Sequence, residues 1–179
     1  MSKSSSETGA VNVPQLNIVT FVDVRRANLT GSLYGNVHMS DNHARSSRRG
    51  SASLQTACIA GQTLNWIIYP IDAQRRPDGT WPPSVRINNL VFLGGDRKNV
   101  SDIRICTDLQ IFGGPDEMRS PVTPVYYYWA GTVVSSLAPG VYPYRFVLEV
   151  DTEDPTRRRY MNLDTPSLRV VDDLAVDGE

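Results

Sequence analysis

Apolar and polar residues alternate in short runs along most of the chain, and glycine, proline, asparagine and aspartate separate the runs. In residues 142–150, every second side chain from Tyr142 onward is apolar or aromatic, while Arg145 and Glu149 fall on the opposite face. Successive side chains of a strand point to opposite sides of a sheet. The pattern therefore predicts a β-strand with one buried face.

Three other runs carry specific expectations. Residues 16–24 are apolar on both faces, which is typical of a central strand. Residues 63–69 place Leu64, Trp66 and Ile68 on one side. In residues 103–111, alternation predicts that four apolar side chains share one face, namely Ile103, Ile105, Leu109 and Ile111.

The complete pattern predicts about ten short strands and contains no convincing helical period. The remaining candidates are residues 32–39, 52–59, 85–93, 122–134, 157–163 and 167–171. This predicts an all-β fold, a two-sheet antiparallel β-sandwich of jelly-roll or immunoglobulin-like type. We expect one sandwich domain over residues 14–171, a disordered N-terminal tail at 1–13 and an acidic C-terminal tail at 172–179.

Composition excludes several classes of function. Lys and Arg number 18 against 19 Asp and Glu, so the formal charge is -1, which argues against a nucleic-acid binder. No apolar run approaches the roughly 18 residues of a membrane span. The polar start of the chain does not resemble a signal peptide, and Cys58 and Cys106 are too few for a disulfide framework. We therefore expect a cytoplasmic protein with two reduced, buried thiols.

The residues offer little for catalysis. His38 and His43 flank a polar loop without a nucleophile elbow, and the spacing of histidines and cysteines suits no transition metal. We predict no catalytic residue, no metal site and no cofactor, with calcium at the acidic loops left open. The alternative is a hydrolase or isomerase that uses the loop carboxylates Asp72, Asp78 and Asp96.

The aromatic residues suggest binding instead. Alternation over residues 126–129 places Tyr127 and Trp129 on one face and Tyr126 and Tyr128 on the other. Trp81 lies in a Pro-Gly loop with polar neighbours, where a sugar ring could stack on it. The sequence predicts a small polar, carbohydrate-like ligand at Trp81, Tyr126, Tyr128, Asp78 and Arg86. The alternative is that these aromatics pack the core or an oligomer interface.

Self-association is also expected. A sandwich leaves edge strands open, and a net charge near zero weakens repulsion between copies. We predict a homo-oligomer, a dimer or larger, formed through an edge strand or a sheet face.

Three stretches resemble one known family. Residues 17–24 form an apolar run that closes on Asp23 and Val24, and residues 50–54 followed by 60–66 read Gly-Ser-Ala-Ser-Leu and Ala-Gly-Gln-Thr-Leu-Asn-Trp. Residues 144–148, Tyr160 and residues 164–168 are similar to a closing strand pair. Together they resemble the bacterial inclusion-body proteins of the PixA and AidA type.

The resemblance implies a cytoplasmic bacterial β-sandwich that accumulates, self-associates or binds carbohydrate, with no catalytic residues to carry over. The chain departs from the family pattern at three places. Gln62 replaces an aspartate, Thr165 is an extra residue before Pro166, and residues 73–85 form a Pro-rich loop.

Overall fold

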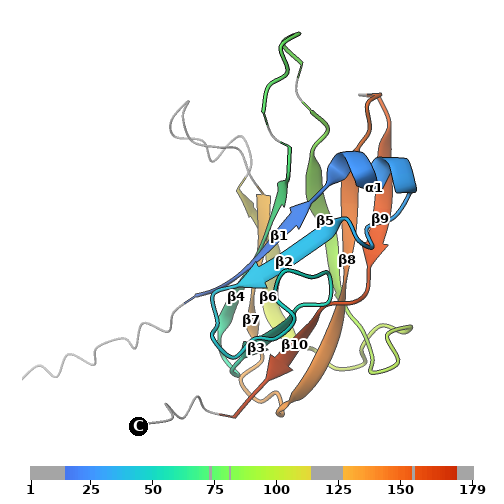
Figure 1. Ribbon diagram of the computed structural model, residues 1–179. Helices are drawn as coiled ribbons and strands as arrows, with labels where there is room; N and C mark the ends of the chain where they lie inside the picture. The colour runs from blue at the N-terminus through green and yellow to red at the C-terminus, as the bar shows by residue number, and fades with distance from the viewer. Residues whose placement is uncertain (1–14, 73, 81, 114–126, 155, 173–179) are drawn as a thin grey trace, which may run out of the picture.

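The computed structural model describes residues 15–72, 74–80, 82–113, 127–154 and 156–172. In this part of the chain, ten strands form two five-stranded sheets that pack face to face, with one short helix at one end (Figure 1). The β1 sheet contains β1 (Leu16–Val22), β2 (Val37–Asp41), β4 (Thr63–Pro70), β6 (Cys106–Gly113) and β7 (Tyr127–Val133). The β8 sheet contains β3 (Gln55–Cys58), β5 (Val85–Phe92), β8 (Gly140–Asp151), β9 (Arg158–Leu163) and β10 (Ser167–Val170). The predicted all-β, two-sheet sandwich is confirmed.

The strand order is β2-β1-β4-β7-β6 in the first sheet and β3-β10-β8-β5 in the second, with β9 paired to β8. Most neighbours are antiparallel, as predicted, but β1 pairs with β4 and β3 pairs with β10 in parallel. Both sheets are therefore mixed. Parallel partners need a long crossover connection, and the alternation within a single strand carries no information about such a partner.

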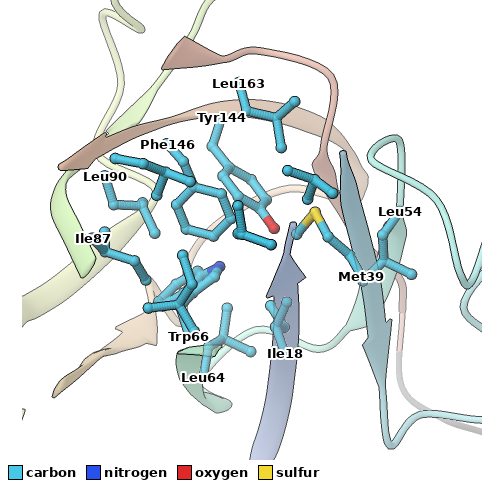
Figure 2. Packing of buried hydrophobic residues seen from close by; sticks show 14 of the residues in the cluster. Ile18, Met39, Leu54, Leu64, Trp66, Ile87, Leu90, Tyr144, Phe146 and Leu163 are labelled. Atoms are coloured by element: carbon cyan, nitrogen blue, oxygen red, sulfur yellow. The ribbon is translucent and has the colours of Figure 1, made fainter. Parts of the chain in front are cut away.

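The core lies between the sheets, where aliphatic side chains surround the aromatic rings of Trp66, Tyr144 and Phe146 (Figure 2). Trp66 of β4 meets Tyr144 of β8 edge to face, with ring centroids 6.1 Å apart, and Tyr144 meets Phe146 in the same way at 5.3 Å. Leu64 and Ile68 are buried beside Trp66. The predicted inward faces of residues 63–69 and 142–150 are thus confirmed.

The apolar residues that alternation groups over 103–111 differ in burial, although Leu109 packs against the core. Ile105 is buried, but Ile103 and Ile111 are exposed. The strand begins only at Cys106, and the pairing of β6 with β7 shifts between Thr107 and Gln110. Ile111 lies opposite Trp129, which points inward, so Ile111 is on the inner side of the sheet and is exposed because β6 is an edge strand.

A helix that the sequence pattern did not predict, α1 (Val24–Thr30), covers one end of the sandwich near β8 and β9 (Figure 1). The carboxylate of Asp23 caps it by accepting a hydrogen bond from the Arg26 amide, and Gly31 ends it with a φ of 68°. Ala27 is buried, and the Asn28 side chain donates to the carbonyl oxygen of Asp151 in β8. Seven residues are too few for a helical period to stand out.

The two cysteines are free and buried, as predicted. Burial raises the pKa of both thiols to about 12, so they are protonated at neutral pH. The predicted tails lie outside the described residues, apart from Asp172. In the part of the chain that the structure describes, no helix is long and apolar enough to cross a membrane.

Candidate functional site

A cavity of about 340 Å³ opens at the end of the sandwich that carries α1. Its walls come from the last residues of β4 and β8 and the first residues of β5, β7 and β9. Tyr127 contributes an aromatic wall, and Arg86, Glu149, Asp151 and Arg158 contribute charged groups. We call it the Glu149 cavity, after its most buried charged residue.

Strand register brings the partners of Glu149 together. Glu149 on β8 lies directly opposite Arg86 on β5 and Tyr160 on β9. The Glu149 side chain is only 5% exposed. Its Oε1 accepts hydrogen bonds from Nη2 of Arg86 and pairs with Nη1 of Arg158 at 2.9 Å, and its Oε2 accepts from the Tyr160 hydroxyl at 3.4 Å. The carboxylate, which solvent hardly reaches, thereby lies between two guanidinium groups.

The charges of this cluster balance. Burial by itself would raise the pKa of Glu149, but the hydrogen bond from Arg86 and the charges of Arg86 and Arg158 outweigh it, so the pKa lies below its usual range. Asp151 lies 3.7 Å from Nε of Arg158. Two cations thus face two anions, and the cavity presents donors and acceptors side by side next to an aromatic ring.

The structure separates the residues predicted for a ligand site. Arg86 lines the Glu149 cavity. Asp78 instead closes a turn in the exposed β4–β5 loop, where its carboxylate accepts from the amide and the hydroxyl of Thr80; these bonds lower the pKa of Asp78. Tyr128 lies on the outer face of the β1 sheet, whereas Trp81 and Tyr126 lie outside the described residues.

Sequence reasoning missed Glu149, Arg158 and Tyr127 as members of this site. Alternation predicts that Glu149 lies on the side of its strand that faces away from the core, but its side chain is buried there, and the arginine opposite it is 63 positions away. Only the pairing of β5 with β8 brings the two together. The run of arginines at 157–159 was the one available signal for a charged partner on β9.

The carboxylates of the alternative enzyme hypothesis lie in loops and none of them lines the Glu149 cavity. Asp96 accepts hydrogen bonds from the amides of Lys98 and Asn99, which lower its pKa and shape a turn. Asp72 borders a second cavity of about 440 Å³, together with Arg76 and Glu153. Arg76 and Glu153 form a bidentate ion pair there, with both N–O distances at 3.0 Å.

The two predicted loop histidines are placed apart from both cavities. His38 is exposed on β2, with Nδ1 3.1 Å from the carbonyl oxygen of Gly50. His43 is half-buried, and burial lowers its pKa. Among the described residues, no three His, Cys, Asp or Glu side chains gather as ligands for a metal ion.

The outer face of the β1 sheet carries a second candidate surface. Trp129 points inward and donates from Nε1 to the Ile87 carbonyl oxygen at 3.0 Å, while Tyr128 stacks on Phe112 with ring centroids 5.4 Å apart. The predicted alternation of residues 127–129 is thus confirmed. Four side chains are direct cross-strand neighbours over β1, β4, β7 and β6: Val19, Ile67, Tyr128 and Phe112. We call them the apolar outer row.

A stacked pair extends this row. Phe21 lies opposite Tyr69 on β4, and their rings stack with centroids 5.9 Å apart. Phe21 is exposed although its strand is central in the sheet. The predicted central position of β1 is therefore confirmed, while its second apolar face is turned to the surface rather than to another layer.

Comparison with known proteins adds to this geometry. A family described as a domain of unknown function, DUF8788, matches residues 14–90, less than half of the chain. No curated protein matches. The crystal structure of the inclusion body protein PixA from Burkholderia cenocepacia is similar over 90% of this chain and 99% of that chain, with a TM-score of 0.60 and 10% sequence identity. The chain has the PixA fold. The resemblance inferred from sequence motifs is thus confirmed at the level of the fold.

Proposed function

We propose that this protein is a non-enzymatic binding and assembly protein that associates with copies of itself. The observation that carries the proposal is the apolar outer row with its adjoining Phe21–Tyr69 stack. Covering such side chains with a second copy removes apolar surface from water, which favours association. The net charge of -1 opposes this little.

Two further observations support the proposal, one for assembly and one for the absence of catalysis. The protein of the same fold is named an inclusion body protein. In addition, the loop carboxylates Asp78 and Asp96 are engaged in turn hydrogen bonds, so they form part of the scaffold rather than a pair of acids poised over a substrate.

Sedimentation velocity over a wide concentration range tests this function. The monomer has a mass of 19.9 kDa, and we expect species of at least twice that mass to grow with concentration. Replacing Phe21 and Phe112 together by serine should shift the population toward monomer, because it removes exposed rings without opening the core. Leu29→Ser, at an exposed position on α1, is the matched control. A wild-type protein that stays monomeric throughout contradicts the proposal.

A second function, binding of a small neutral polyhydroxylated ligand such as a sugar, is favoured by the Glu149 cavity. A volume of about 340 Å³ is within the range of small-molecule sites. Because the cations and anions balance, a neutral ligand avoids an unpaired charge. Each hydroxyl can accept from an arginine and donate to a carboxylate, while the Tyr127 ring offers a stacking face.

Calorimetric titration with a panel of neutral mono- and disaccharides tests this second function. We expect binding that is lost in Tyr127→Ala and Arg86→Ala but retained in Arg104→Ala, an exposed arginine outside the cavity. Trp81→Ala is the separate test of the site predicted from the sequence. If no sugar binds, or if binding survives Tyr127→Ala and Arg86→Ala, the cavity is not a sugar site.

The cytoplasm is the compartment that we propose for this protein. Cys58 and Cys106 are free thiols, and reduced cysteines are typical of reducing compartments. Localisation of a tagged full-length chain in its own host tests this directly, and a protein found outside the cytoplasm contradicts it.

A further inference from the structure

Self-association requires a contact, and the edge strands differ in how well they supply one. Resting on the proposed function, we propose that β6 is the contact: β6 of one copy pairs antiparallel with β6 of a second copy, so that two β1 sheets join into one. An edge strand presents unpaired amide and carbonyl groups that a second chain can complete.

The edges formed by β2 and β3 are already covered. Met39 of β2 pairs with Ser51, and the Gly50 amide donates to the Met39 carbonyl oxygen. On the neighbouring edge, Gln55 of β3 exchanges two backbone hydrogen bonds with Ser47. The segment between β2 and β3 therefore hydrogen-bonds to the edge backbone of both strands within the same copy, so these groups are not free for a second copy.

The β5 and β9 edges are unsuitable for other reasons. The indole of Trp129 donates to the backbone of β5 at Ile87, and the Ser101 amide donates to Phe92 at the end of the strand. At β9, Arg158 and Arg159 begin the strand and Arg157 precedes it. Charged side chains along an edge strand are a device by which natural sheets prevent pairing with another chain.

The β6 edge has the opposite character. Ile111 is 50% exposed and Phe112 is 36% exposed. The one charged residue of the strand is Asp108, located within the bulge. In the described part of the chain, no backbone hydrogen bond joins residues 107–113 to a segment other than β7. An apolar, lightly charged edge of this kind favours pairing.

In the proposed pair, a two-fold axis passes through Ile111. Ile111 of one copy then lies opposite Ile111 of the second copy, and Gln110 lies opposite Phe112 of the second copy on the outer face. The two Asp108 carboxylates lie at opposite ends of the pair, so like charges do not meet. The apolar outer row ends at Phe112, which this arrangement places beside Gln110 of the second copy.

The test measures association of the full chain by sedimentation equilibrium for wild type, Ile111→Lys and Val141→Lys. Val141 is the matched control, because it is a strand residue with 51% exposure on the outer face of the other sheet. We expect Ile111→Lys to weaken association by about tenfold or more, because the two lysines of a pair would lie opposite each other on the axis and repel. Val141→Lys should associate as wild type does.

A cysteine at the axis supplies a positive test that does not depend on the lysine variant folding. Directly opposite residues of an antiparallel pair have Cα atoms about 4.5–5.5 Å apart, within the range of roughly 4.4–6.8 Å that a disulfide spans. Ile111→Cys should therefore form a covalent dimer on mild oxidation, and Val141→Cys should not. The native thiols are buried and do not interfere.

The outcomes separate the two proposals. A monomeric wild type overturns the proposed function itself. A wild type that associates, together with undiminished association of Ile111→Lys and no cross-linking of Ile111→Cys, overturns the β6 pairing alone.

Discussion

Glu149 illustrates how a nearly dry carboxylate is tolerated in this fold. Its partners are Arg86 on β5 and Arg158 and the Tyr160 hydroxyl on β9, and both strands are neighbours of β8. Desolvating the carboxylate costs free energy that these partners offset, so the cluster adds little net stability compared with an apolar core. Removing one member is costly, because it leaves the others without a partner.

The pH dependence of stability should reveal this residue. The pKa of Glu149 is lowered from an ordinary value of 4.5 in the folded state. Its stabilising contribution is therefore fully present above about pH 4.5 and is lost as the pH falls through the folded-state pKa. We expect Glu149→Gln to be about 1–3 kcal/mol less stable than wild type near neutral pH, with the difference shrinking in acid.

Urea unfolding at neutral and acidic pH measures this difference. Glu153→Gln is the control, because Glu153 also pairs with an arginine but its side chain is 62% exposed. Its substitution should change stability by less. If the loss of unfolding free energy in Glu149→Gln stays constant or grows as the pH falls, the negative charge of Glu149 is not what stabilises the cluster.

The elements differ in how clearly the sequence announces them. Strict alternation correctly predicts the inward faces of β4 and β8, because one side of each strand packs on a continuous core. In β6 alternation does not reveal that Ile111 is exposed, because β6 is an edge strand, nor that Asp108 adopts a positive φ of 52° within a bulge. The α1 helix was missed, although Asp23 before it and Gly31 after it are the residues that cap short helices.

The α1 caps give an element-scale prediction. Asp23→Ala removes the acceptor for the Arg26 amide and should lower the free energy of unfolding by about 1 kcal/mol. Asp23→Asn keeps an acceptor at the same position and should retain most of the stability. Chemical denaturation of both variants measures the effect. Equal losses in the two variants would mean that the charge of Asp23, rather than its cap, stabilises this end of the sandwich.

At the scale of the whole molecule, the sequence pattern does not predict which strands, distant in the chain, pair with one another. Leu16 lies beside Leu64 in a parallel pair, and Arg86 lies opposite Glu149, yet nothing local in either segment specifies its partner. The candidate site depends on such pairs, which is why one predicted ligand residue, Arg86, reached the cavity while Asp78 and Tyr128 lie elsewhere. The apolar outer row likewise becomes visible only when four strands are placed side by side.

Hydrogen–deuterium exchange of the wild-type chain at low and high protein concentration tests the central claim, association through the β1 sheet, most directly. Backbone amides that become paired or covered exchange more slowly. We predict slower exchange at high concentration in peptides that cover β6 and its neighbour β7, with peptides of β9 unchanged. Identical exchange at both concentrations throughout the chain, or slowing confined to β9, would contradict it.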